Sequence, residues 1–193
     1  MFFKMRSAYS VATISAILTA AAVASAAYKA ENSSVVIHAK GPLGLNIEGK
    51  SSKLIVEEND KTVTFKTFLN TIDTGNGMRN SHMQKRLGHG YNSKGDETEM
   101  FGITLAVPKD KVDSKKGGSV TGQLSFHGVT KPVKVDYSID GSKHVSAKFE
   151  LNVFDHFPVT PKFSQEDKDK LLCNTGVCAK PEVKVEVSFD LKE

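Results

Sequence analysis

The chain has 193 residues, of which 39% are hydrophobic and 25% are charged, a balance typical of one globular domain or at most two. The formal net charge is +4, and loss of Lys4 and Arg6 with an N-terminal targeting segment would lower it to about +2. A mature chain this close to neutral gives no support to nucleic-acid binding or to anionic-membrane binding.

The first 27 residues have the layout of a secretory signal peptide. Lys4 and Arg6 precede an apolar stretch over residues 8–23, and the small residues 24–27 supply an A-x-A cleavage site. A membrane anchor is the alternative, but the stretch is short and rich in Ala, Ser and Thr. We therefore expect a signal peptide over residues 1–27 and a mature domain over residues 28–193. The location would be periplasmic or secreted, with no stable membrane span after cleavage.

The mature part is dominated by runs in which apolar and polar residues alternate with a period of two, which predicts half-buried strands. In chain order the runs are Val35–Ile37, Leu43–Gly49, Leu54–Glu58, Val63–Leu69, Phe101–Val107, Val120–Phe126, Val133–Ile139, Val145–Val153 and Val183–Leu191. Most connections are short and rich in turn residues, and no long segment has a helical apolar period. The pattern predicts an all-β fold, an antiparallel up-and-down β-barrel of about eight strands. A sheet closed on itself would have no free edges.

Two connections are long, Thr71–Thr98 and Phe154–Pro181. Loops of this length usually carry function or short helices. Residues 78–87 could form a short helix closed by Gly88, and Ser164 is a plausible N-cap for a second helix. In a simple meander both loops follow strands that end at the same rim, so we expect two helical flaps over one end of the barrel.

Cys173 and Cys178 are the two cysteines of the chain. In an exported protein a structural disulfide is the leading interpretation, with Asn-Thr-Gly as the turn between them. A metal site lacks a second Cys or His pair with matching spacing, and a redox dithiol would usually show Cys-x-x-Cys.

Catalytic motifs are absent from the sequence, so we expect no enzyme, no metal and no cofactor. His82 lies near Arg79 in the first long loop without acid–base partners at a useful spacing. The simpler interpretation is that Arg79, Asn80 and His82 fasten a short helix to the rim. His127, His144 and His156 are expected to be solvated.

The inner face is left as the candidate site. A barrel of about eight strands is either just filled by side chains or holds one small ligand. Thr67, Gly122 and Ala147 are small residues on the inward parity, which would leave room for a ligand. A solid core remains the alternative on pattern alone.

Several stretches resemble the YceI family of exported, lipocalin-like proteins that bind polyisoprenoids and other long-chain lipids. The most specific is "GQLSFHGVTKPVKVDY" at 122–137, which is similar to a G-x-L-T-I-x-G-V-T-K-P-V hairpin of the family. "FLNTIDTGNGMRNSHMQKRL" resembles a strand end followed by an R-D-x-H-L helix start, with Asn80 and Met83 in place of Asp and Leu. "FELNVFDHFPV" and "PEVKVEVSFDLKE" extend the likeness to the end of the chain.

The resemblance implies an eight-stranded barrel with a hydrophobic tunnel, no catalytic residues and, in several members, a homodimer. The chain departs from the family where an F-F-D-x-x-x-Y-P stretch is usual, since residues 87–102 read "LGHGYNSKGDETEMFG". This departure alters the rim near the first flap, so the identity of the ligand does not carry over.

The sequence therefore predicts an exported protein that holds a polyisoprenoid or fatty-acyl ligand for transport, storage or stress protection. The predicted lining residues are Phe65, Leu69, Phe101, Ile103, Leu105, Leu124, Phe126, Val135, Tyr137, Phe149, Leu151, Val187 and Phe189. Arg79 and His82 are candidates for contact with a polar head group. Two alternatives stay open: a non-catalytic protein-interaction or scaffold module with a solid core, and an enzyme acting on lipid, which would need a nucleophile or metal at the mouth.

Overall fold

The computed structural model describes residues 26–89, 100–113, 115–174 and 176–191. Most of the predicted signal peptide and part of the first long loop lie outside these ranges. The strands of the main sheet are β1 (Ala26–Lys29), β2 (Glu31–Lys40), β3 (Asn46–Ser51), β4 (Ile55–Glu58), β5 (Thr62–Phe68), β6 (Gly102–Pro108), β7 (Gly117–Phe126), β8 (Val129–Ile139), β9 (His144–Asn152) and β12 (Glu182–Asp190).

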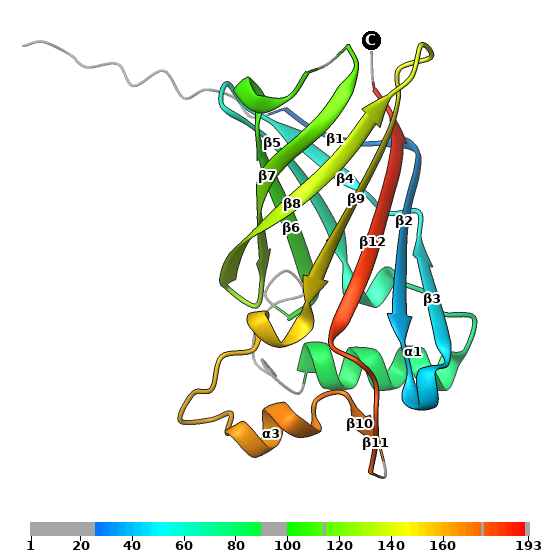
Figure 1. Ribbon diagram of the computed structural model, residues 1–193, viewed down its shortest axis with the longest axis vertical. Helices are drawn as coiled ribbons and strands as arrows, with labels where there is room; N and C mark the ends of the chain where they lie inside the picture. Colours follow the sequence, from blue (N-terminus) through cyan, green and yellow to red (C-terminus); the bar gives the residue numbers. More distant parts are fainter. Residues whose placement is uncertain (1–25, 90–99, 114, 175, 192–193) are drawn as a thin grey trace, which may run out of the picture.

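These strands form one antiparallel, curled, barrel-like sheet, which confirms the predicted all-β class (Figure 1). Their order is β1-β4-β5-β6-β7-β8-β9-β12-β2-β3. The path is up-and-down from β4 to β12, β12 then pairs with β2, and β1 pairs with β4 instead of with β2. The sheet has ten strands because β1, which includes Ala26 and Ala27 of the predicted signal peptide, pairs with β4.

The prediction of a closed sheet without edges was wrong for the part of the chain that the structure describes. There β1 and β3 are edge strands and do not pair with each other. The free edge of β3 pairs with the segment after β5 instead of with a strand. The backbone of Asp73 in this segment exchanges two hydrogen bonds of 2.8 Å with Lys50 of β3. The hydroxyl of Ser51 adds a bond of 2.7 Å to that of Thr71. These backbone and side-chain hydrogen bonds therefore hold the segment after β5 against the free edge of β3.

Both long connections lie at one end of the barrel, called here the flap end, as predicted (Figure 1). The first contains η2 (Leu69–Thr71), α1 (Gly77–Met83) and a π-helical turn, η3 (Gln84–His89). The second contains η5 (Val153–His156), α3 (Gln165–Lys170) and the small hairpin β10 (Cys173–Asn174) and β11 (Val177–Cys178). Ser164 caps α3 in a reciprocal capping box with Asp167.

The remaining short helices lie in turns between strands. They are η1 (Pro42–Gly44) at the flap end and η4 (Lys109–Lys111) at the opposite end, called here the turn end. Among the described residues, no helix is both long enough and apolar enough to cross a bilayer.

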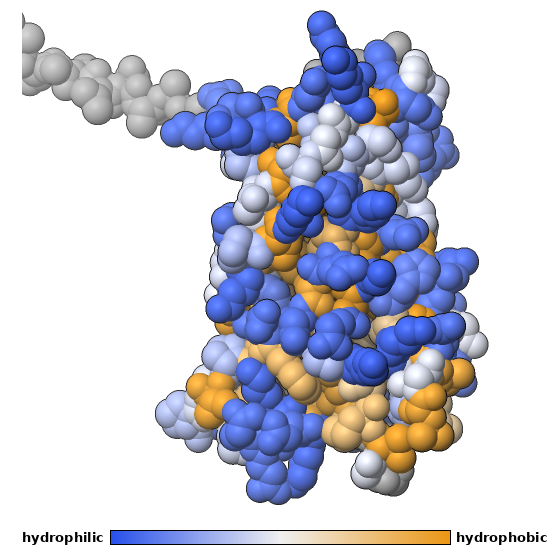
Figure 2. Space-filling view, viewed as in Figure 1, coloured by the Kyte–Doolittle hydropathy of each residue, from blue (hydrophilic) through white to orange (hydrophobic). Residues whose placement is uncertain are grey.

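The buried side chains fall into two clusters, one inside the sheet and one under the flaps. The flap cluster joins the two long connections to the barrel, since Leu69, Phe101, Phe126, Phe157 and Leu171 pack together. Polar side chains cover much of the outer face in view, with apolar patches near the flap end (Figure 2). The buried flap cluster thus holds the described parts of the two long connections against the barrel.

Candidate functional site

The curled sheet encloses a cavity of about 470 Å³. Its walls are almost entirely aliphatic and aromatic side chains from the inner face of the sheet, with contributions from both flaps. This volume lies in the range of roughly 300–1,000 Å³ that is usual for small-molecule sites. The interior is therefore not filled from end to end by its own side chains.

Strand alternation and antiparallel register place the lining residues in rows across the sheet. One row consists of Val56, Phe65, Leu105 and Leu124 on β4, β5, β6 and β7. Every second residue of each strand points inward, so a register fixed by one buried pair fixes the rest of the inner face. The two-residue period of the sequence is thus the direct cause of the apolar lumen.

Two rings meet inside the barrel. Phe65 of β5 and Phe189 of β12 belong to strands that do not pair, yet their ring centroids lie 5.4 Å apart. Both residues also line the cavity. The lumen is therefore narrowed here by an aromatic contact, and a ligand has to pass beside these rings.

All of the predicted lining residues except Phe101 lie around this cavity. They are Phe65, Leu69, Ile103, Leu105, Leu124, Phe126, Val135, Tyr137, Phe149, Leu151, Val187 and Phe189. Phe101 is buried instead in the flap cluster, where a Cβ on Gly88 would come within 2.2 Å of its ring. Their role in ligand binding stays a prediction.

Arg79 and His82 do not line the cavity. His82 is exposed on α1, and Arg79 is half-buried beside the carbonyl of Thr74. Asn80 fastens this helix: its Oδ1 accepts bonds from the Thr74 backbone N–H at 2.9 Å and from the Thr74 hydroxyl at 2.6 Å. The Asn80 amide also donates to Asp73, which lowers the pKa of that carboxyl. Structural fastening by Asn80 agrees with the simpler interpretation of the first long loop.

Gly122 was expected to leave room in the lumen, and this expectation was wrong. A Cβ at Gly122 would lie 2.7 Å from Cδ1 of Leu105, so the neighbouring leucine already occupies the space. Thr67 and Ala147 do line the cavity. A glycine on the inner face therefore adds to the cavity only where no side chain of a neighbouring strand fills the space beside it.

Sequence reasoning missed several lining residues that come from the flaps. Met83 and Leu87 reach the cavity from the first flap, and Val153 and His156 reach it from η5. The spacing of four between Met83 and Leu87 puts them on one helical face, a signal that could have found them. No comparable spacing in the sequence predicts that His156 faces the cavity.

The histidines differ from the expectation that all three are solvated. His156 is only 1% exposed, and burial lowers its pKa. His127 is half-buried and donates from Nε2 to the carbonyl of Leu87. His144 binds Asp190, with 2.7 Å between Nδ1 and Oδ1. The strand ends of this barrel are covered by flaps and neighbouring strands, which a linear pattern does not reveal.

Polar groups contact the cavity mainly at its two ends. Glu58, Lys109 and Tyr137 do so near the turn end, where Glu58 and Lys109 pair with each other. His156 does so at the flap end, and Thr67 lies on β5 between them. No group of three or more Asp, Glu, His or Cys side chains suited to a metal occurs within the described ranges.

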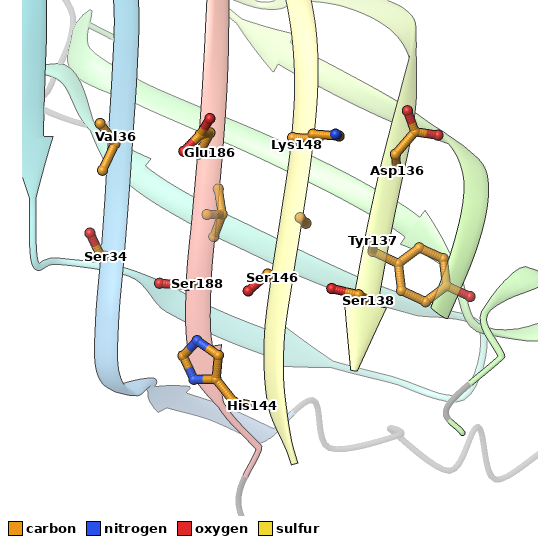
Figure 3. Close-up of a pocket in the computed structure, with 12 residues that line it drawn as sticks. Ser34, Val36, Asp136, Tyr137, Ser138, His144, Ser146, Lys148, Glu186 and Ser188 are labelled. Carbon is orange, nitrogen blue, oxygen red and sulfur yellow. The ribbon is translucent and has the colours of Figure 1, made fainter. Parts of the chain in front are cut away.

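A second hollow of about 630 Å³ lies on the outer face of β2, β12, β9 and β8 (Figure 3). Ser34, Ser188, Ser146 and Ser138 form a register row across these strands, and Val36, Glu186, Lys148 and Asp136 form the next. This hollow is larger, but polar and apolar atoms line it about equally. The cavity inside the curled sheet has almost wholly apolar walls, so it is the better candidate for binding a ligand that must leave water.

A family model for the YceI-like domain matches residues 27–191. The chain belongs to the YceI-like family. The match spans nearly the whole described part of this YceI-like protein and includes both flaps. No curated protein gives a significant match.

Solved structures share the YceI-like fold at low sequence identity. A polyisoprenoid-binding domain from Saccharophagus degradans, implicated in plant cell wall breakdown, has a TM-score of 0.60 at 15% identity, covering 86% of this chain and 97% of its own. Burkholderia cenocepacia BcnA has a TM-score of 0.51 at 18% identity, covering 81% of this chain and 94% of its own. At these identities the likeness shows the fold alone.

Proposed function

We propose that this protein is an exported, non-catalytic carrier that holds one long-chain apolar molecule, of the polyisoprenoid or fatty-acyl type, inside its barrel. The observation that carries the proposal is the cavity of about 470 Å³ inside the curled sheet, with its almost wholly apolar walls. Burying each CH₂ group contributes about 0.8 kcal/mol, so a chain of ten or more carbons can bind without directed polar contacts.

Two further observations support the proposal. A structural neighbour from Saccharophagus degradans is a polyisoprenoid-binding domain, which is consistent with the same ligand class here. Export is supported by the signal-like first 27 residues and by the disulfide between Cys173 and Cys178, a bond suited to an oxidising compartment. A solid-core scaffold module is disfavoured because it predicts no such cavity.

The direct test is organic extraction of protein purified from its own host, followed by mass spectrometry, together with uptake of added prenyl and acyl chains. We expect a co-purifying lipid, or saturable uptake at one chain per barrel. An empty barrel in repeated preparations that also takes up neither kind of chain would overturn the proposal.

A matched pair of variants locates the binding site. Ala147 faces the cavity, and Ser146, the preceding residue of β9, is its neighbour on the outer face of the same strand. Ala147→Phe puts a ring into the lumen and should reduce uptake at least tenfold, whereas Ser146→Phe should leave uptake unchanged. Equal uptake by both variants would contradict binding inside the barrel.

A further inference from the structure

One polar side chain at the flap end of the cavity has an unused hydrogen-bonding atom. His156 lies in η5, is 1% exposed and lines the cavity. Its Nδ1 is 3.0 Å from the carbonyl oxygen of Val129. A carbonyl can only accept, so Nδ1 carries the proton and donates it. Nε2 is then a bare acceptor.

Nε2 of His156 has no hydrogen-bond partner among the residues that the structure describes. Burial lowers the pKa of this imidazole, which keeps the ring neutral and leaves the Nε2 lone pair free at neutral pH. Most buried polar atoms have a partner, because an unsatisfied one costs free energy. Because His156 lines the cavity, a molecule inside the cavity can supply a donor to Nε2.

The other polar groups around the cavity already have partners. The hydroxyl of Thr67 donates to the carbonyl of Lys53 at 2.9 Å. Glu58 and Lys109 form an ion pair, and the Tyr137 hydroxyl accepts from the backbone N–H of Asp113 at 2.6 Å. The Thr67 hydroxyl keeps acceptor lone pairs on β5, whereas Nε2 of His156 is the open acceptor in η5, at the flap end of the cavity.

We infer that the molecule held in the barrel carries a neutral hydrogen-bond donor, such as a hydroxyl group, at the end of its chain that lies against His156. This inference rests on the proposed function and names the ligand class: a long-chain alcohol bound with its hydroxyl at the flap end and its chain directed toward the turn end.

The test compares two ligands that differ in one hydrogen-bond donor. Geranylgeraniol and its methyl ether share the same chain and oxygen, but the ether has no proton to donate; octadecanol and its methyl ether form a second pair with a saturated chain. We expect calorimetry on the wild-type protein to show each bound alcohol about tenfold tighter than its ether, the effect of one added hydrogen bond.

Variants assign the preference to His156. In His156→Phe the alcohol and the ether should bind equally, and in His156→Gln, which keeps an acceptor, part of the preference should return. Val153→Ala is the matched control, because Val153 lies in the same η5 turn and lines the cavity with apolar atoms only. It should weaken both ligands of a pair alike and preserve the tenfold ratio.

The outcomes distinguish failure of this inference from failure of the proposed carrier function. Equal affinity of alcohol and ether for the wild-type protein overturns the inference while the carrier function stands, and this comparison needs no variant to fold. A preference that survives unchanged in folded His156→Phe overturns the role of His156. Binding of neither chain type would overturn the proposed function itself.

Discussion

Nδ1 of His156 lies 3.0 Å from the carbonyl oxygen of Val129, 27 residues earlier in the chain. The bond joins η5, the start of the second flap, to the first residue of β8. It fixes the imidazole ring at the flap end of the cavity and sets its tautomer. This hydrogen bond thus anchors the second flap to β8 and leaves Nε2 as the acceptor nitrogen of the ring.

Buried His156 should make stability depend on pH. Its folded-state pKa is below the ordinary value of 6.5, because burial disfavours the charged ring and Lys131 repels it, while the bond to Val129 and the charge of Asp155 only partly oppose this. The unfolded chain therefore binds more protons as pH falls through about 6.5, and stability should decrease until the lowered folded pKa is passed.

Urea denaturation at a series of pH values measures this slope. His156→Gln should lose this part of the slope, and His82→Gln, which removes an exposed histidine of α1, should keep it. A wild-type slope retained in His156→Gln would contradict the assignment to His156.

Two glycines of the first flap should respond to alanine in opposite directions. A Cβ at Gly88 would lie 2.2 Å from the ring of Phe101, so Gly88→Ala should cost about 1–3 kcal/mol by overpacking the flap cluster. Gly77, in α1, has open space at its Cβ position, so Gly77→Ala should stabilise by about 0.5 kcal/mol. Thermal unfolding of both variants checks the signs, and destabilisation by both would contradict the packing argument.

The Cys173–Cys178 disulfide should stabilise the second flap. The bond closes a loop with a sequence separation of 5 and links directly paired residues of β10 and β11. The chain-entropy relation for so short a loop gives about 2 kcal/mol. We expect the double variant Cys173→Ser, Cys178→Ser to lose up to this amount in denaturant unfolding and to be unaffected by a reductant. Wild-type stability in the double variant would show that the bond is dispensable.

The contact between Phe65 and Phe189 should appear as an energetic coupling. In a double-mutant cycle with leucine at both positions, we expect about 0.5–1.5 kcal/mol of coupling from the ring pair. Phe65 packs against the barrel cluster and Phe163 lies in the flap cluster, so a cycle between these two should be additive within about 0.5 kcal/mol. Additivity of Phe65 with Phe189 would mean that the rings do not meet in solution.

Local patterns could predict strands and their inward faces because strand periodicity is a local property. Leu105, Leu124 and Phe149 were correctly placed around the lumen from parity alone. Ser164 was correctly identified as a helix cap because capping depends on the next three residues. Parity failed for Phe101, since this residue precedes β6 and packs under the flaps.

The pairing at the free edge of β3 and the cavity-lining residues of the flaps could not be predicted in the same way. The bridge between Lys50 and Asp73 replaces a strand pairing, and nothing in either local sequence indicates the other. His156 was expected in water because a polar residue in a loop is usually exposed. Its burial depends on the arrangement of both flaps over the barrel.

The sequence by itself determined the all-β class, the inward rows of apolar side chains, the positions of the two flaps and the family, because alternation, turn residues and motifs are written along the chain. Only the tertiary structure decided that the sheet has two edges, that a cavity remains between Phe65, Phe189 and the walls, and that His156 faces it. These features depend on side-chain volumes and hydrogen bonds between residues far apart in sequence, which become neighbours only when the sheet curls.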